Sequence, residues 1–179
     1  MRVLTCDQKL ELLGLNLRAF IDNLQADEIN PVLEKYGLTQ VEPMKWYSAA
    51  QWLSALNDLQ QEVNMTSNLV AIGMEIGRTS PMPPGSNPTL PEVLSIWNDA
   101  LYQPLFRNGD PGTISLEKIS DRHYVSIHKH LWPDDFSYGI AYGFARRFLP
   151  PKTAFRVAYD QNMPRMDEGG QSTRIHVEW

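Results

Sequence analysis

The sequence has a single cysteine, Cys6, in 179 residues, so no disulfide can form within the chain. Such a chain suits a reducing compartment, and we predict a cytoplasmic location. A reactive thiol needs a positive neighbour, whereas Asp7 places a negative charge beside Cys6 and raises the thiol pKa. We therefore interpret Cys6 as structural rather than as a nucleophile.

Long apolar runs and clusters of positive charge are also missing. Charged residues such as Lys9, Glu11 and Arg18 interrupt the first 24 residues, so we expect no signal peptide. No stretch approaches the roughly 20 apolar residues of a membrane span. The net charge is -5, and Lys and Arg are not clustered, which argues against a nucleic-acid partner.

Recognisable catalytic motifs are absent as well. The sequence contains no Gly-x-Ser-x-Gly elbow, no Walker loop and no dinucleotide-binding fingerprint. Asp134 and Asp135 are adjacent, so on a helix they would point about 100° apart and could not face each other as an acid–base pair. We interpret them as residues that favour a helix start. A small reductase or hydrolase is therefore only a second alternative, and an enzyme is not the favoured interpretation.

The first half has the apolar spacing of amphipathic helices. We predict helices over residues 10–24, 27–36, 47–63 and 68–77, and another from 89 to about 105. Gly37 suits the left-handed position after a helix, and Thr89 with Glu92 has the spacing of a capping box. The proline-rich residues 80–88 can form only a loop.

The second half changes to the two-residue period of strands. Strands are predicted over residues 114–119, 124–130, 155–159 and 174–179, with a helix from 133 to about 149. The predicted fold class is α+β, with a helical N-terminal half packed on a C-terminal antiparallel sheet of about four strands and one crossing helix. We expect one domain, 1–179, with a helical region over residues 1–110, an α/β region over residues 111–179 and no strand before residue 80.

Two pairs of glycines lie within predicted helices. Glycine costs a helix up to about 1 kcal/mol relative to alanine, so each position should have a compensating reason. For Gly73 and Gly77 the four-residue spacing indicates tight core packing. For Gly139 and Gly143 we expect the helix to lie tight against the sheet or a ligand.

The four histidines are the residues most suited to hold a metal. His128 and His130 alternate, so they share one face of a strand, but zinc normally takes three or four protein ligands. His123 and His176 are the other two histidines, and none lies at a recognised ligand spacing. We favour surface or strand-end histidines, with all four as the candidates for any metal.

The second half resembles haem nitric-oxide-binding domains and four-vinyl-reductase domains, over roughly residues 90–179. The run 114–122 resembles the strand with a Tyr-x-Ser-x-Arg motif, with Lys118 in place of the Tyr and Ser120 and Arg122 in their usual places. The run 138–148 resembles the glycine-containing helix of the haem family. Residues 169–179 resemble the end of four-vinyl-reductase domains.

This resemblance implies a ligand-binding sensor or carrier domain with a pocket between the helical half and the sheet. Haem domains bind iron through a histidine on the helix before these strands, but residues 94–102 contain none. Haem ligation in the family manner is therefore not expected, although Ser120 and Arg122 could contact another ligand's carboxylate. The expected lining residues are apolar or aromatic: Trp97, Leu101, Tyr102, Leu116, Tyr138 and Tyr142.

The expected ligand is a small molecule that is either simply hydrophobic or tetrapyrrole-like and that could carry a carboxylate, with haem or another tetrapyrrole left open as a cofactor. A haem-based gas or redox sensor with a non-family histidine ligand is the first alternative. The resemblance also implies a homodimer and a signalling output domain as partner, and a chain that ends at Trp179 fits an input domain.

Overall fold

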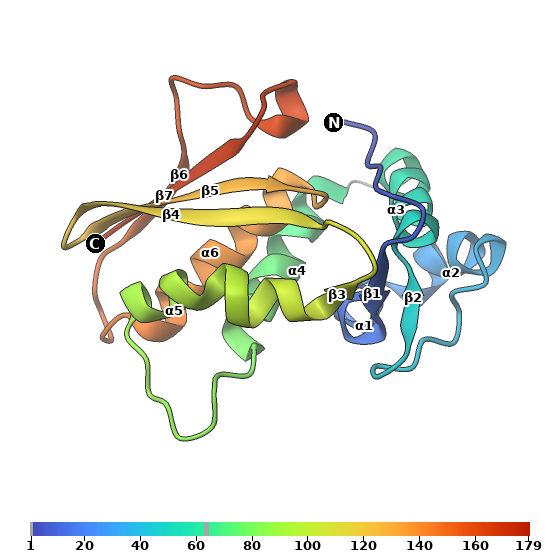
Figure 1. The fold of residues 1–179 in the computed structure, drawn as a ribbon, viewed down its shortest axis with the longest axis horizontal. Helices are drawn as coiled ribbons and strands as arrows, with labels where there is room; N and C mark the ends of the chain where they lie inside the picture. Colours follow the sequence, from blue (N-terminus) through green and yellow to red (C-terminus); the bar gives the residue numbers. More distant parts are fainter. Residues whose placement is uncertain (1, 63–64) are drawn as a thin grey trace.

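The computed structural model describes residues 2–62 and 65–179 (Figure 1). The first half contains β1 (Glu11–Leu13), α1 (Gly14–Ile21), α2 (Ala26–Lys35), β2 (Trp46–Ser48), α3 (Ala49–Glu62) and α4 (Met65–Thr79). The second half contains α5 (Leu90–Ile96), the π-helix η1 (Trp97–Tyr102), the 3-10 helix η2 (Gln103–Leu105), β3 (Phe106–Arg107), β4 (Gly112–Ser120), β5 (His123–His130), α6 (Asp134–Phe148), β6 (Arg156–Tyr159), the 3-10 helix η3 (Met166–Glu168) and β7 (Thr173–Glu178). The predicted end of the third helix, Val63, lies outside the described residues.

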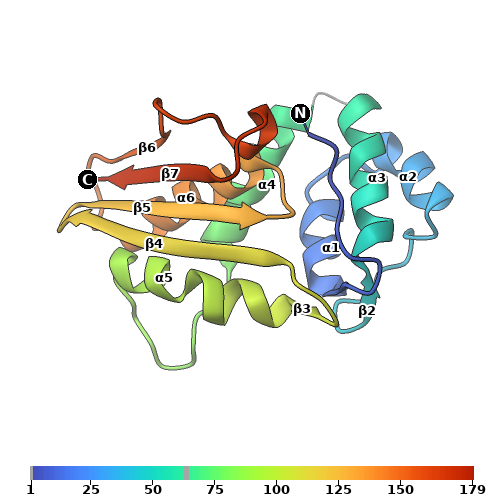
Figure 2. The same ribbon diagram turned by 45° about the horizontal axis from the view of Figure 1, so that its top comes forward.

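The main sheet has four strands in the order β4-β5-β7-β6, and every neighbouring pair is antiparallel. Helices α4, α5 and α6 lie on one side of it, and α1, α2 and α3 stand beside its end (Figure 2). The predicted α+β class and the β-β-α-β-β order of the second half are confirmed. The sheet thus provides a wall against which the helices can enclose a cavity.

The prediction of no strand before residue 80 is wrong. Residues 11–13 form the central strand of a small sheet in the order β2-β1-β3, in which Leu12 pairs with Tyr47 and with Phe106. The predicted helix over residues 10–24 therefore begins only at Gly14. Apolar spacing compatible with a helix was overridden here by backbone pairing with distant segments.

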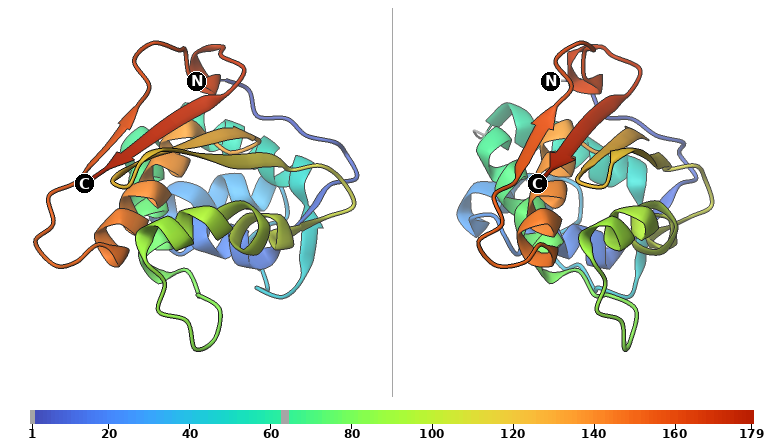
Figure 3. Two further views of the ribbon diagram at one scale, coloured as in Figure 1. Left: turned by 60° about the vertical axis from the view of Figure 1, so that its left-hand side comes forward. Right: turned by 90° about the vertical axis from the view of Figure 1, so that its left-hand side faces the viewer.

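The glycines at four-residue spacing face one another across the contact between α4 and α6. A methyl group added to Gly139 would lie 2.9 Å from Gly73 Cα, and one added to Gly143 would lie 3.0 Å from Gly77 Cα. Figure 3 shows these two helices side by side beneath the sheet. Close packing at Gly143 is therefore confirmed, but the partner is helix α4 rather than the sheet or a ligand.

Several local predictions are confirmed. The Thr89 N–H donates a hydrogen bond to Glu92 Oε2 at 2.7 Å, which completes one arm of the capping box. Gly37 has φ +65° and follows Tyr36, the C-cap of α2, and residues 80–88 contain no helix or strand. Burial, followed by the charge of Asp7, raises the pKa of the Cys6 thiol. Among the described helices, none has the length and apolar character needed to cross a membrane.

Candidate functional site

A cavity of about 480 Å³ lies between the helical half and the sheet. Its walls come from α1, the end of α4, η1 with η2, and α6, while β4 and β5 close one end. The lining residues are Leu15, Asn16, Arg18, Ala19, Asp22, Asn23, Glu75, Ile76, Thr79, Ser80, Pro81, Trp97, Ala100, Leu101, Tyr102, Leu105, Ile114, His130, Trp132, Phe136, Ser137, Ile140 and Phe144. The volume is in the range of small-molecule sites, and the predicted place of the pocket agrees with the structure.

One face of α6 forms the apolar side of this cavity. Phe136, Ile140 and Phe144 recur every four residues and are all nearly buried, so they lie along a single stripe of the helix. Ser137 adds one hydroxyl next to this stripe. The spacing was visible in the sequence, but it gave no sign of which α6 face lines a pocket.

The helices η1 and η2 form the opposite wall, and their side chains hydrogen-bond to the backbone of β4 and of Pro111 just before it. Asn98 Oδ1 accepts a hydrogen bond from the Ile114 N–H at 2.9 Å, and the Tyr102 hydroxyl donates to Pro111 O at 2.6 Å. Gln103 Nε2 donates to Gly112 O at 2.7 Å. π-Helical turns are rare and are frequent at functional sites, and this one is fixed on its sheet side.

A chain of buried hydrogen bonds starts at the pocket wall. The Trp132 N–H donates to His130 Nδ1 at 3.2 Å, so the proton of a neutral His130 ring must be on Nε2. That nitrogen lies 2.9 Å from His128 Nδ1 and 3.1 Å from Ser137 Oγ. His128 Nε2 then donates to Ser126 Oγ at 2.9 Å. Each ring nitrogen of the pair therefore has a partner within the protein.

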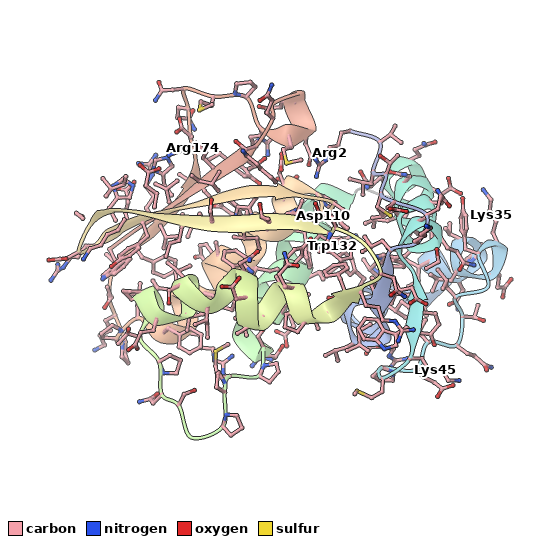
Figure 4. The ribbon with its side chains drawn as sticks, in the orientation of Figure 1. Arg2, Lys35, Lys45, Asp110, Trp132 and Arg174 are labelled. Carbon is pink, nitrogen blue, oxygen red and sulfur yellow. The ribbon has the colours of Figure 1, made fainter. Side chains whose placement is uncertain are left out.

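Both rings of this pair are held in the neutral form. Burial is the main cause, and it lowers the pKa of His130 to about 3, with a further contribution from the charge of Arg2. The pKa of His128 is likewise lowered by burial and by His130. Arg2 itself lies beside Trp132 in Figure 4, and it donates to the carbonyl oxygens of His130 and Trp132 at 2.8 and 2.7 Å. The expectation of surface or strand-end histidines is wrong for His128, which is buried within β5. His130 is the last residue of β5, as expected, but its side chain is buried rather than at the surface.

Three of the predicted lining residues, Trp97, Leu101 and Tyr102, do line the cavity. Leu116 does not, because it lies further along β4 than Ile114, the one β4 residue in the wall. A ligand contact by the first three residues stays a prediction.

Tyr138 and Tyr142 lie on a different face of α6 from the cavity. The Tyr138 hydroxyl donates to Val157 O at 3.1 Å, and the Tyr142 ring packs against Phe155 with 5.0 Å between ring centres. Both side chains thus cover the contact between α6 and the β6 segment. The expectation that Tyr138 and Tyr142 line the pocket is therefore wrong, because this face of α6 is turned away from the cavity.

Ser120 and Arg122 form the turn between β4 and β5 and do not line the cavity. The Arg122 N–H donates to Ser120 Oγ at 3.3 Å, as in an ordinary polar turn. Both residues are exposed. Their placement gives no support to a carboxylate contact inside the cavity.

His123 and His176 lie on the opposite face of the sheet from the cavity. His123 Nε2 and His176 Nδ1 are 2.8 Å apart, and Glu178 lies beside them. The four histidines thus form two separate pairs, one on each face of the sheet.

Neither a family model nor a curated relative matches the chain. Solved structures of H-NOX proteins do match in fold. An H-NOX protein from S. oneidensis in the Fe(II) ligation state is 14% identical, with 93% of this chain and 95% of that chain covered and a TM-score of 0.66. The Cs H-NOX protein is 12% identical, with 93% and 96% covered and a TM-score of 0.69. An Fe(II) unliganded H-NOX protein from K. algicida is 12% identical, with 93% and 96% covered and a TM-score of 0.67.

The chain therefore has the fold of H-NOX proteins, and the likeness extends over nearly the whole length rather than the second half alone. The helical first half, which carried no motif of its own, is included in the match. The resemblance to four-vinyl-reductase domains receives no support from these comparisons.

The residues around the cavity do not fit a haem held by an axial protein ligand. The helical wall from Trp97 to Leu105 contributes no imidazole, and burial raises the pKa of the Tyr102 phenol well above its usual value, so that group stays protonated. His130, the imidazole that lines the cavity, uses both ring nitrogens in hydrogen bonds within the protein.

The charges at the mouth of the cavity also disfavour an anionic ligand. Arg18 is already paired with Asp22 at 2.7 Å, and Glu75 adds a second carboxylate that is paired with Arg78. Haem carries two carboxylates that would need positive partners here. The lining therefore suits an uncharged apolar ligand better than haem.

Proposed function

We propose that this chain is a ligand-binding sensor domain whose ligand is an uncharged, largely apolar small molecule held in the cavity. The observation that carries the proposal is the cavity itself, with its apolar lining and its place between the helical half and the sheet. The H-NOX fold supports a binding role rather than a catalytic one. Ser137 does lie beside His130, but the nitrogen that faces it carries the ring proton and cannot act as its base.

The ligand would be recognised by shape and by a few polar groups. The aromatic edges of Trp97 and Phe144 would contact its faces, and the Ser137 hydroxyl would supply one hydrogen bond. His130 stands behind Ser137 and orients its hydroxyl. An uncharged carbonyl or hydroxyl on the ligand would satisfy Ser137, whereas a carboxylate would be buried without a cation.

Ligand binding would change the arrangement of the helices that line the cavity. Helix α1 belongs to the first half, while η1 and α6 belong to the second, so a ligand touches both halves at once. A ligand that prefers one spacing of these walls shifts the population of states accordingly. A signalling output domain and a second copy of this chain are the partners we propose to respond to that shift.

The test uses a tryptophan at an exposed position on the rim of the cavity. Ala100 is exposed and lines the cavity from η1, so Ala100→Trp places a large ring where a ligand would enter. Ser95→Trp on the preceding turn is the matched control, because Ser95 is equally exposed but lies outside the lining. Binding of Nile red, an uncharged dye, and of protoporphyrin dimethyl ester, an uncharged flat probe, would be measured by fluorescence. We expect the ester to displace the dye from the original protein and from the Ser95→Trp variant, and neither probe to bind the Ala100→Trp variant. Equal binding by both variants would contradict the proposal.

A haem-based sensor is the second candidate, because one of the similar H-NOX structures is in an Fe(II) ligation state and another concerns haem distortion in that family. In this chain His130 is the histidine placed to reach such a group, and its neutral ring is the form that binds iron. Its bonds to His128 and Ser137 would first have to break.

Haemin titration distinguishes the two candidates. A haem sensor would give a sharp absorption band near 400 nm that His130→Ala abolishes and His123→Ala leaves unchanged, since His123 lies on the other face of the sheet. A protein that binds the neutral ester but gives no such band is the outcome we expect.

A further inference from the structure

The second histidine pair lies on the face of the main sheet that is turned away from the cavity. His123 is at the start of β5, directly opposite Glu178 of β7, and His176 is two residues before Glu178 on the same face. Neither histidine contributes to the proposed ligand pocket. The two faces of one sheet thus carry unrelated groups.

The geometry points to a site for a divalent transition metal of the zinc class, formed by His123, His176 and Glu178. The donor atoms are His123 Nε2, His176 Nδ1 and a carboxylate oxygen of Glu178, all within 4.8 Å of one another. The two nitrogens are 2.8 Å apart, and His123 Nε2 is 3.8 Å from Glu178 Oε1.

These distances are close to what the metal requires. Zinc bonds of about 2.0–2.1 Å at tetrahedral angles place neighbouring donor atoms about 3.3 Å apart. The nitrogen pair is slightly shorter than this and the nitrogen–oxygen pair slightly longer. Small side-chain rotations would make the set suitable, without movement of the paired strands that carry it.

The carboxylate of Asp160 lies next to the His176 ring and favours the tautomer that can bind a metal. His176 Nε2 lies 3.4 Å from Asp160 Oδ2, so that nitrogen carries the ring proton and Nδ1 directs its lone pair at His123. The Asn162 N–H donates to Asp160 Oδ1 at 2.8 Å and holds this carboxylate in place. Carboxylate–histidine pairs of this kind are the usual outer support of zinc ligands. For His123, the ring proton has to move from Nε2 to Nδ1 when the metal enters.

The site is open to solvent on one side. The side chains of His123, His176 and Glu178 are 26%, 24% and 39% exposed, which lets an ion enter and leaves a position for water. Two cations lie nearby: Arg156 is 3.9 Å from Glu178, and Arg174, labelled in Figure 4 on β7, is 3.5 Å from Asp160. Arg174 also pairs with Glu117, whereas the carboxylate partner of Arg156 is Glu178 itself, so Glu178 would bind the metal beside this guanidinium.

The test is zinc binding by the whole chain after removal of metals with a chelator. Competition against a coloured zinc indicator should give one zinc per chain, and added Co²⁺ should give the visible bands of a tetrahedral site. His176→Ala should remove this binding. Asp160→Asn, which weakens the support of the His176 ring, should lower zinc affinity about 10–100-fold.

Glu117→Gln is the matched control, because Glu117 lies on the same face of the sheet and pairs with Arg174 but has no place in the ligand set. Its zinc affinity should equal that of the original protein. If His176→Ala does not fold, as judged by circular dichroism, His123→Gln serves in its place. The inference is overturned if the original chain binds no zinc at micromolar concentration, or if a folded His176→Ala or His123→Gln variant binds zinc as well as the original.

Discussion

Replacement of Gly143 by alanine tests the close contact between α4 and α6. The added methyl group would lie 3.0 Å from Gly77 Cα and 3.2 Å from Arg78 N, and closer still to the carbonyl oxygen of Met74. Carbon atoms in ordinary contact are about 3.5–4.0 Å apart, so the helices would have to separate by roughly 0.5–1 Å. All three of these neighbours are backbone atoms, which cannot rotate out of the way.

The magnitude follows from two opposing effects. Overpacking of a core costs roughly 1–3 kcal/mol, whereas alanine in a helix gains about 1 kcal/mol over glycine. The cost should lie toward its upper end because backbone must move, so we expect a net loss of about 1–2 kcal/mol. Valine is larger and a poorer helix former, and Gly143→Val should lose more.

Thermal unfolding followed by circular dichroism measures this effect. A loss of about 1 kcal/mol lowers the Tm by roughly 2–4 °C in a chain of this size. Arg146→Ala is the control, because Arg146 is exposed on the last turn of the same helix, and its Tm should hardly change. A higher Tm for Gly143→Ala would refute the reasoning, since it would mean that helix propensity alone decides the stability at this position.

Three further predictions concern stability. His128 and His130 are buried and neutral, and their pKa values are lowered in the folded chain, to about 3 for His130. Below about pH 6.5 the unfolded chain therefore binds protons at these two rings that the folded chain does not bind. The free energy of unfolding should therefore fall as the pH falls below about 6.5, by up to about 1.4 kcal/mol per pH unit for each histidine. Urea unfolding at pH 7, 6 and 5 measures this change. A free energy of unfolding that does not change with pH would contradict the buried neutral pair. Asn98→Ala removes the acceptor of the Ile114 N–H and should cost roughly 1–3 kcal/mol in the same assay, whereas an unchanged value would mean that water replaces it. Thr89→Ala removes the N-cap of α5 and should cost about 0.5–2 kcal/mol, an effect to be compared by urea titration with Ser95→Ala near the other end of that helix.

Local signals gave the main elements of this fold correctly. The capping box at Thr89 and the two-residue period of the last strands each depend on neighbours in the sequence. Residues 11–13 have no such signal, because their extended form depends on pairing with residues 46–48 and 106–107. Their leucines fit a helical stripe equally well, so the sequence alone could not separate the two states.

The site was harder to predict than the fold. Alternation placed His128 and His130 on one face, but Val125 and Ile127 on the other face are also apolar, so the pattern could not say which face is buried. On α6 the four-residue spacings of the tyrosines, of the glycines and of the apolar set Phe136, Ile140 and Phe144 were all visible in the sequence. Which of these three sets faces the cavity depends on where α4 packs against α6.

The small sheet has a consequence for how this chain acquires its structure. Its central strand β1 comes first in the chain, yet one of its two partners, β3, lies beyond residue 105. During synthesis on the ribosome, one edge of β1 therefore stays unpaired until most of the chain has emerged, and folding should be slower than in a purely helical protein. Helix α4 likewise lacks its packing partner until α6 has been synthesised. A chain cut in the exposed loop 80–88 should consequently yield two fragments that each fail to fold alone but assemble when mixed.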